Sequence, residues 1–492
     1  MFSLNLFFEL GLIAAGLILF WRFLNRPATI LYALALAVSF ISVNIHIGFT
    51  FYVSRILLAW LLIVILIRRM HNLRRGIDLH VNPAFLILFS GTIFIQTITS
   101  LSAPSVSDSF RQMFIYLSMM SIFLAVLILG VEVAVIVRAI YFYLAFAIVQ
   151  GLVGVYQVIG GILGWPMYQD FLRGISMGNL RHAQRVFWFP EEMVPRAFGF
   201  FSDANQYAGY MVGVIVLALA LVVWNRKRMF PYLVLVIGFA GLMLSLSRSG
   251  MITLVVFGIP ALLLFRHRVR FSVRWLFRPM LLLGGVLILL VVAGMEMGGD
   301  LQTRSGEFNI WNTIRGRFES LAHPGESERY HQLSRLMALD AFVSSPLIGV
   351  GLGVNSAPWH SARYNEDWAG AHSHHLDTLG QTGLLGAGLE WIFMLVVGIH
   401  MWRGLLSSRK GSRERAVLAG VLAAFIAIIL GNLFYHYYLN DFVWFLMGCG
   451  VALSHRIRLE AQVCGVTAKS SDLICSSATK APWPSSGSQS IH

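Results

Sequence analysis

Apolar residues occur along this chain in runs of about twenty, and short polar or basic segments separate the runs. A helix needs about 20 consecutive apolar residues to cross the hydrocarbon core of a bilayer. By that measure the sequence contains about thirteen candidate membrane-spanning helices. They cover residues 4–22, 28–46, 50–68, 83–101, 111–130, 132–159, 204–224, 230–247, 249–265, 279–295, 383–402, 415–434 and 439–455. The pattern predicts an all-α polytopic membrane protein with roughly 12–13 transmembrane helices.

The composition agrees with a membrane protein and excludes a soluble one. Of the 492 residues, 57% are hydrophobic and only 12% are charged, whereas soluble domains carry roughly 25% charged residues. The net charge is +14, but most Lys and Arg residues form short clusters between the apolar runs. Because such clusters orient membrane proteins, we expect no nucleic-acid partner. The three cysteines form neither a CxxC pair nor a zinc-ligand spacing.

The basic clusters also predict which side of the membrane each connection faces, since Lys and Arg accumulate in cytoplasmic connections. The predicted cytoplasmic clusters contain Arg22 and Arg26, Arg68 to Arg75, Arg138, Arg226 to Arg228, Arg266 to Arg278, Arg403 to Arg415, and Arg456 with Arg458. Counting helices from any one cluster reaches the next cluster on the same side. This topology puts the N-terminus outside the cell and the C-terminus inside.

The topology divides the chain into successive regions. Residues 1–295 hold the first ten transmembrane helices and an extracytoplasmic loop over about 160–203. Residues 296–382 form a large extracytoplasmic loop, predicted to fold as a cap of short helices over the bundle. Residues 383–458 hold the last transmembrane helices, and residues 459–492 form a cytoplasmic tail predicted to be disordered, because it is rich in Ser and poor in apolar residues. Long loops in a compact bundle are usually functional, so we expect the site on the extracytoplasmic side.

The segment that starts at His372 is the most specific candidate for chemistry. It reads His-Ser-His-His and enters a predicted transmembrane helix through Gly383 and Gly386. A neutral histidine at the membrane surface can take a proton from a hydroxyl near physiological pH. The alternative is that these histidines only cap the loop at the interface. A metal site is not predicted, because helical metal ligands favour i, i+4 spacing and His372, His374 and His375 do not share one face.

Arg248 is the second candidate, in the tight turn between two strongly apolar runs. An arginine at that depth is costly unless it meets a partner, and it is a functional candidate for that reason. Its guanidinium fork matches phosphate oxygens in a bidentate manner. The alternative is that the side chain extends to the lipid headgroups. Positive charge on the outer side opposes the usual bias, which favours a function.

A third candidate segment contains Arg329 and Arg335 and leads to a glycine-rich turn that ends at Gly353. The first part is typical of an amphipathic helix on the membrane surface. The turn could bind an anion with its backbone amides. The alternative is that the two arginines lie on a solvated helix face.

The fourth segment runs from Arg196 to Asn205 and opens the predicted helix 204–224. Arg196 is a candidate contact for a phosphate or a sugar. Asp203 and Asn205 are residue types that cap helix N-termini, and capping is the simpler interpretation for each of them.

These four segments, in this order, resemble the O-antigen ligase and O-antigen polymerase superfamily. The superfamily pattern is Arg-x-x-Gly-x-Phe-x-x-x-Asn, then Ser-Arg-Ser/Gly, then Arg followed by Pro-Leu-x-Gly-x-Gly, then His-Asn/Ser-x9-Gly-x-x-Gly. The sequence supplies the first at 196–205, the second at 247–250, the third at 329–351 and the last at 372–386. The resemblance covers about 196–390, and the N-terminal half matches only as a series of membrane spans.

The resemblance implies a metal-independent, inverting glycan transfer without a cofactor, at the periplasmic face of the bacterial inner membrane. The implied donor is a glycan on undecaprenyl diphosphate, and the acceptor is a sugar hydroxyl of lipid A–core or of a growing glycan. Arg248 and Arg329 look similar to arginines that bind the diphosphate, and His372 to the histidine that deprotonates the acceptor. The implied substrate contacts are Arg196, Asn205, Arg335 and His375, and membrane lipids surround the bundle.

We favour the ligase reaction, in which the acceptor is lipid A–core. A polymerase of the same superfamily shares the donor and the mechanism and differs in the acceptor. A solute transporter or flippase is less favoured, because such proteins carry ionisable residues inside their spans and repeat symmetry. The predicted spans have almost no Asp, Glu or Lys at their centres and show no such repeat.

Overall fold

The computed structural model of the protein describes residues 26–39, 44–47, 49–52, 55–63, 82–129, 131–163, 196–225, 227–264, 302–303, 306–307, 326–354 and 358–468. The helices are α2 (Pro27–Ala37), α4 (Pro83–Leu101), α5 (Val106–Leu129), α6 (Val133–Leu163), α9 (Ala204–Trp224), α10 (Met229–Leu244), α11 (Arg248–Ile252), η2 (Thr253–Gly258), α12 (Ile259–Leu264), α15 (Glu326–Ser344), α16 (His374–Ser407), α17 (Arg413–Gly431), η4 (Tyr437–Leu439) and α18 (Asp441–Ala468). The strands pair antiparallel as β1 (Asn44–Ile47) with β2 (Phe49–Tyr52), β3 (Gln302–Thr303) with β4 (Gly306–Glu307), and β5 (Trp359–Ser361) with β6 (Glu366–Trp368).

Among the described residues, six helices are long and apolar enough to cross a membrane, namely α4, α5, α6, α9, α16 and α17. The protein is therefore an all-α polytopic membrane protein, as the apolar runs predict. The helices α4 and α9 have the predicted bounds 83–101 and 204–224. The start of α9 is fixed by Asp203, whose carboxylate accepts hydrogen bonds from the first helical amides. The predicted spans 4–22 and 279–295 lie outside the described residues.

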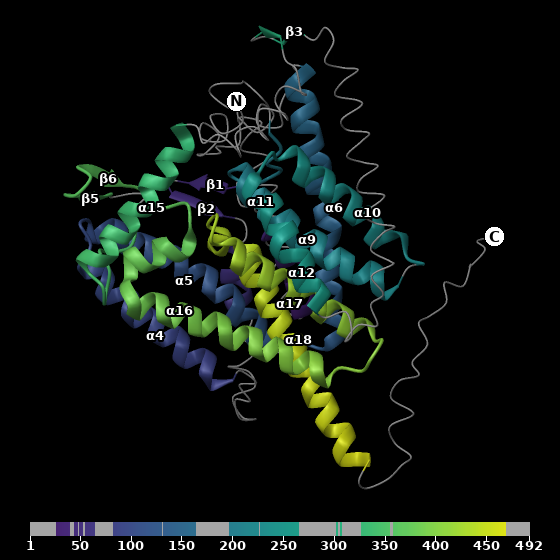
Figure 1. Ribbon diagram of the computed structural model, residues 1–492. Helices are drawn as coiled ribbons and strands as arrows, with labels where there is room; N and C mark the ends of the chain where they lie inside the picture. The colour runs from purple at the N-terminus through teal and green to yellow at the C-terminus, as the bar shows by residue number, and fades with distance from the viewer. Residues whose placement is uncertain are drawn as a thin grey trace, which may run out of the picture.

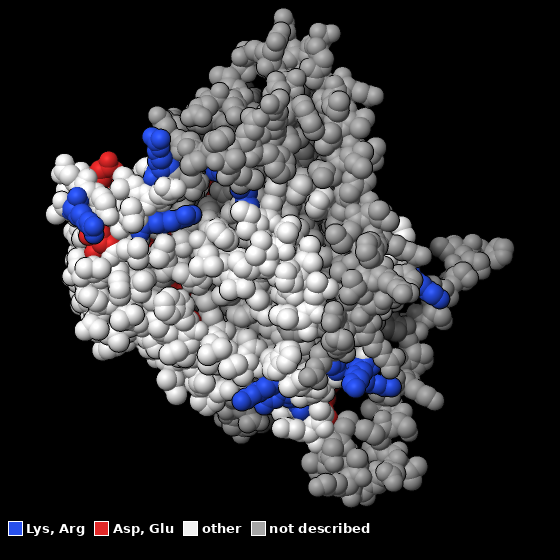
Figure 2. Space-filling model, viewed as in Figure 1, with Lys and Arg blue, Asp and Glu red and all other residues white. Residues whose placement is uncertain are grey.

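The described helices pack around α9, which is buried along almost its whole length and contacts α10 and α17 (Figure 1). Figure 2 shows Lys and Arg gathered at two opposite ends of this face of the molecule, with a broad band between them that is nearly free of charge. Large apolar side chains point outward from the described helices, for example Ile87 (70% exposed), Phe114 (64%) and Leu395 (62%). Such a surface is stable against lipid tails.

The predicted spans 28–46 and 50–68 are wrong in part. The helix α2 ends at Ala37, and the strands β1 and β2 form a short hairpin in which Asn44 pairs with Tyr52. A helical segment then covers residues 55–63. The sequence Asn-Ile-His-Ile of β1 alternates polar and apolar residues, which is a strand pattern. Hydropathy summed over long windows does not detect a period of two.

The helix α16 begins at His374, nine residues before the predicted start at 383, and contains a break at Gly383. The backbone angles there are φ 61° and ψ −166°, a conformation that is essentially restricted to glycine. The break frees backbone amides, and the amide of Leu384 donates to the carbonyl of Pro346 (2.8 Å). In the other direction, the amide of Val350 donates to the carbonyl of Gly380 (3.1 Å). The glycine-rich turn therefore fills the break in α16.

This pairing corrects the prediction that the glycine-rich turn binds an anion. The amides of Gly349, Val350, Gly351 and Gly353 donate to oxygens of Ser345, Gly380 and Gln381, so they are not available to a ligand. Gly349 has φ 73°, and a Cβ there would overlap the backbone of Gln381. The glycines are needed because two backbone segments approach closely.

Among the described residues of the 296–382 loop, the cap contains the 19-residue helix α15 and the hairpins β3–β4 and β5–β6. The helix α15 packs with the hairpin β5–β6 around the buried side chains Met337, Ala338 and Trp368. Trp368 also lies against Gly380 of α16, so the cap is fixed on the first turns of that helix. At the other end of the chain, α18 continues to Ala468, and residues 459–468 of the predicted tail are therefore helical. The remainder of that tail lies outside the described residues.

Candidate active site

One part of the site is built from hydrogen bonds around Arg196. Its Nε donates to the carbonyl of Ser245 (2.8 Å), and a terminal nitrogen donates to Asn205 Oδ1 (3.4 Å). Asn205 Oδ1 also accepts a hydrogen bond from Ser247 Oγ (2.8 Å). The structure thus joins the segment 196–205 to the Ser-Arg-Ser turn. We call Arg196, Asn205, Ser247, Arg248 and Ser249 the arginine side of the site.

Arg248 is placed by the turn between α10 and α11. Leu246 has φ 51°, which reverses the chain, and Ser247 caps α11 by accepting a hydrogen bond from the amide of Gly250. Arg248 follows at the first position of α11 and is half-buried. The hydroxyls on either side of it, Ser247 Oγ and Ser249 Oγ, lie 3.1 Å apart. Its backbone position is therefore fixed from both sides.

The turn of residues 432–440 connects this region to the rest of the site. Tyr437 donates its hydroxyl hydrogen bond to Ser249 Oγ (3.1 Å), and Tyr435 donates to Asp203 Oδ2 (2.7 Å). Between these two tyrosines, His436 Nε2 lies 3.2 Å from Asp377 Oδ2 in the first turn of α16. The turn contacts α9, α11 and α16 with three consecutive side chains.

The other part of the site surrounds His372, which has φ 51° and lies directly before α16. Its ring is 4.3 Å from the ring of His331 and 6.1 Å from the ring of His436, centroid to centroid. His331 and Arg335 are one helical turn apart on the same face of α15. Burial, with His331 and Arg335 as neighbours, lowers the pKa of His372 to about 4. We call His331, Arg335, His372 and His436 the histidine side.

Arg329 lies elsewhere on α15. It is exposed, and at about 100° per residue it points about 160° away from His331 around the helix axis. Arg335 has the opposite placement, since it is half-buried and close enough to lower the pKa of His372. Its Nε is buried and has no hydrogen-bond partner among the residues that the structure describes. The structure therefore brings Arg335 to His372 and leaves Arg329 at the surface.

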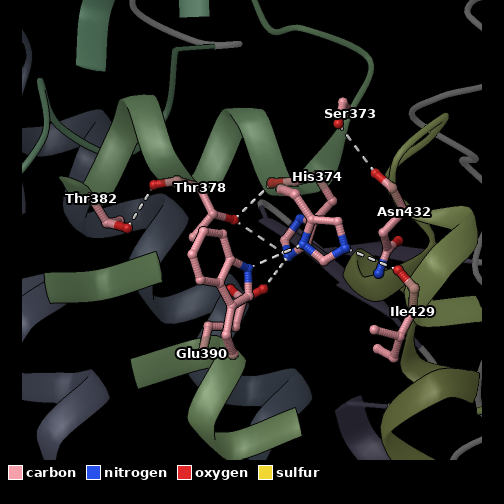
Figure 3. A network of polar contacts seen from close by, with 9 residues as sticks. Ser373, His374, Thr378, Thr382, Glu390, Ile429 and Asn432 are labelled. Carbon is pink, nitrogen blue, oxygen red and sulfur yellow. Dashed lines mark hydrogen bonds and ion pairs between the residues drawn. The ribbon is translucent and has the colours of Figure 1, made fainter. Parts of the chain in front are cut away.

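The next two histidines of the segment make contacts with distant parts of the helices, and Figure 3 shows His374 beside Glu390. His374 Nε2 lies 2.7 Å from Glu390 Oε1, four turns further along α16, and the His374 side chain is fully buried. His375 Nε2 bonds to the carbonyl of Ile429 (2.9 Å), and its Nδ1 accepts a hydrogen bond from Trp391 (3.2 Å). Both nitrogens of His375, predicted to contact substrate, are thus engaged within the protein.

Residues 233–389 match the family model described as O-antigen ligase. Over these residues the chain is similar to the O-antigen ligase family. No curated protein sequence matches the chain. The matched residues start in α10 and end in α16, and they include Arg248, Arg335 and His372. Arg196 and His436 lie outside the matched residues, and the fold brings them to the same site.

Several residues of the candidate site were not predicted from the sequence. These are His331, Asp377 and the turn residues Tyr435, His436 and Tyr437. A signal for the turn is present, because residues 435–438 form the only polar interruption between the predicted spans 415–434 and 439–455, on the predicted extracytoplasmic side. Their partners are distant in sequence, so spacing gives no indication of which residues they contact.

The sequence also missed a half-buried cation, Arg55, that lies near the start of α18. Arg55 donates to Ser118 Oγ of α5 and lies 3.4 Å from Asp441 Oδ1. Asp441 directly follows the 432–440 turn, so this ion pair connects the end of the turn to Arg55. Within the described residues, no group of three or more His, Cys, Asp or Glu side chains is arranged to hold a metal ion.

Proposed function

We propose that this protein is an O-antigen ligase, which transfers a glycan from undecaprenyl diphosphate to a sugar hydroxyl of lipid A–core. The observation that carries the proposal is the convergence of the arginine side and the histidine side, within and around the residues that match the O-antigen ligase family. One side offers guanidinium groups for a diphosphate, and the other offers a neutral histidine for a hydroxyl.

In the proposed reaction, the acceptor oxygen attacks the anomeric carbon of the donor glycan. The bond between that carbon and the phosphate oxygen breaks, undecaprenyl diphosphate leaves with the electron pair, and the anomeric carbon is inverted. His372 takes the proton of the acceptor hydroxyl. Since a diphosphate is a good leaving group, the protein mainly has to place the reactants and stabilise the negative charge that develops.

Arg248, Arg196 and Arg329 are the proposed contacts for the diphosphate, and Asn205 keeps Arg196 in place. Guanidinium groups suit this task because they bind phosphate oxygens in pairs and stay protonated. Arg335 is proposed to bind substrate beside His372, where its buried Nε has no partner in the described residues. Neither His374 nor His375 is assigned a contact with substrate, because their described bonds go to other helices.

The low pKa of His372 keeps the ring neutral, and a neutral ring is required for a base. A base with a pKa of about 4 is weak, however, at neutral pH. A donor diphosphate beside the ring brings negative charge, which stabilises the imidazolium and raises the pKa. We therefore propose that donor binding activates His372, so that the base becomes effective only with the donor in place.

The proposed location is the periplasmic face of the bacterial inner membrane. Support comes from the direction of α16, which starts at the site and ends near the basic segment 403–415, a segment predicted to be cytoplasmic. The site and this segment are at opposite ends of a helix of 34 residues, which is long enough to cross the bilayer.

The test uses the purified full chain in EDTA, with a lipid-linked glycan donor and lipid A–core as the acceptor. A ligase yields lipid A–core that carries the glycan, seen as a shifted band on a gel, and added Mg²⁺ does not increase its amount. Lengthening of the lipid-linked donor without this band contradicts the ligase proposal and identifies a polymerase. Absence of both products contradicts glycan transfer and favours the alternative that the protein is a transporter or flippase.

A further inference from the structure

His436 lies at a point where the two sides of the site meet. Its ring centroid is 6.1 Å from that of His372 and 6.5 Å from that of His374. The turn that carries it is anchored on both sides, by Tyr435 on Asp203 and by Tyr437 on Ser249. These two hydrogen bonds fix the turn on the N-terminal ends of α9 and α11, and they therefore fix the position of the His436 ring.

The two ring nitrogens of His436 have different surroundings. Nε2 lies 3.2 Å from Asp377 Oδ2. Nδ1 is buried without a hydrogen-bond partner among the described residues. Leaving a buried polar atom unpaired costs on the order of 1–3 kcal/mol, so an unpaired nitrogen beside a catalytic histidine needs an explanation.

Burial, with His374 and His372 as neighbours, lowers the pKa of His436 to about 3, so this ring is also neutral. A centroid distance of 6.1 Å is too long for a direct hydrogen bond between the rings of His372 and His436. It leaves room for one oxygen atom that makes a hydrogen bond of about 2.8 Å to each ring. The side chain of His436 is 20% exposed and that of His372 is half-buried, but Nδ1 of His436 is covered, so neighbouring side chains have to move before a substrate reaches it.

We infer that His436 is a second acceptor-binding residue, and that the acceptor hydroxyl is held between the rings of His372 and His436. This inference rests on the proposed glycan transfer and adds to it the residue that orients the nucleophile. In this arrangement Nδ1 of His436 carries the ring proton and donates a hydrogen bond to the hydroxyl oxygen, while His372 takes the single hydroxyl proton. Nε2, on the side of Asp377, is then the unprotonated nitrogen.

The two amide substitutions of His436 separate this role from a structural one. Asn places a polar atom close to the position of Nδ1, whereas Gln places one close to the position of Nε2. If Nδ1 aligns the acceptor, His436→Asn keeps most of the activity, and His436→Gln loses it although it keeps the contact with Asp377. If the ring only supports the fold through Asp377, the order of the two variants is reversed.

The measurement is steady-state transfer by the full chain in detergent, with the acceptor and the donor varied separately. For His436→Gln we expect kcat/KM for the acceptor to fall roughly tenfold or more, while KM for the donor stays unchanged. His436→Asn is expected to recover most of this loss. The matched control is His360→Gln, since His360 lies 2.9 Å from Asp367 on the exposed hairpin of the cap, away from the site.

Different results overturn different statements. A wild-type chain that transfers no glycan defeats the proposed function itself. A wild-type chain that transfers, together with a His436→Gln variant that has an unchanged kcat/KM for the acceptor, overturns only the inference about His436. Equal losses in both amide variants also overturn it, since they show a structural role. Thermal unfolding of each variant identifies a loss of activity that comes from a misfolded chain. If His436→Gln is misfolded, the activity of His436→Asn alone tests the inference, and a loss in a folded His436→Asn variant overturns it.

Discussion

The arginine side and the histidine side of this site are organised in opposite ways. On the arginine side, Arg196, Asn205 and Ser247 are linked to each other by hydrogen bonds and to the ends of α9, α10 and α11. On the histidine side, the rings of His331, His372 and His436 lie near each other, and Arg335 Nε and His436 Nδ1 have no hydrogen-bond partners among the described residues. The arginine side is held in place by hydrogen bonds within the protein, and the histidine side leaves these two polar atoms without a partner.

The difference follows from what each region has to bind in the proposed reaction. A diphosphate has the same charge and shape in every donor, so a fixed arrangement of guanidinium groups suits it and needs no reorganisation. The acceptor brings a neutral hydroxyl, which must lose a proton. The base that receives this proton has to be neutral before the substrate arrives, and a buried imidazole meets this requirement. The predictions below test this division, from the largest expected effect to the smallest.

Removing the base should have the largest effect. We expect His372→Ala to reduce transfer by about 10²–10⁴-fold, because general bases contribute about that much. The measurement is the initial rate of glycan transfer to lipid A–core. The control is His360→Ala in the exposed hairpin, which should transfer like the wild type. Retention of more than a tenth of the rate in His372→Ala would remove His372 from the mechanism.

On the arginine side, Arg248→Ala should reduce transfer by about 10²–10³-fold, the usual loss when one donor to a developing negative charge is removed. Arg248→Lys should recover only part of the rate, since lysine keeps the charge and loses the fork. The exposed Arg363, which lies over the ring of Tyr364 in the cap, provides the control variant Arg363→Ala. Equal rates in both alanine variants would contradict a phosphate-binding role for Arg248.

The break in α16 holds the histidine side in place, and Gly383→Ala should disturb it. A Cβ at this position overlaps the carbonyl of Leu347, and the backbone conformation is unfavourable for alanine. We expect a loss of stability of about 1–3 kcal/mol, measured by thermal unfolding in detergent. Gly388→Ala is the control, since Gly388 lies in the same helix with open space around it and should be neutral or slightly stabilising. An unchanged Tm for Gly383→Ala would show that the break is not required.

The smallest effect expected is a shift in pH dependence that distinguishes Arg335 from Arg329. A base must be deprotonated, so kcat/KM of the wild type should fall only when the pH drops towards about 4, the pKa of His372 in the free protein. Arg335 lowers this pKa, so Arg335→Gln should raise it and move the acid limb to higher pH. Arg329→Gln should weaken donor binding and leave the acid limb in place, because Arg329 is exposed on another face of α15. An equal shift in both variants would contradict the placement of the two arginines.

Much of the fold can be predicted from the sequence because a bilayer imposes a simple rule on it. The bounds of α4 and α9 follow from the lengths of their apolar runs and, for α9, from the cap at Asp203. Elements that do not depend on the length of an apolar run were not predicted. The hairpin β1–β2 follows a period of two, and the break at Gly383 exists because a second segment supplies the missing hydrogen-bond partners.

The sequence by itself determined the class of protein, the positions of most described helices and the segments that carry the chemistry, including Arg248 and His372. These properties depend on local composition and on residue types at short spacing, which a chain displays directly. Only the tertiary structure decided that Arg335 and not Arg329 meets His372, that the glycine-rich turn fills a helix break, and that His436 joins the site. Each of these depends on contacts between segments far apart in the chain, which form only when the helices pack.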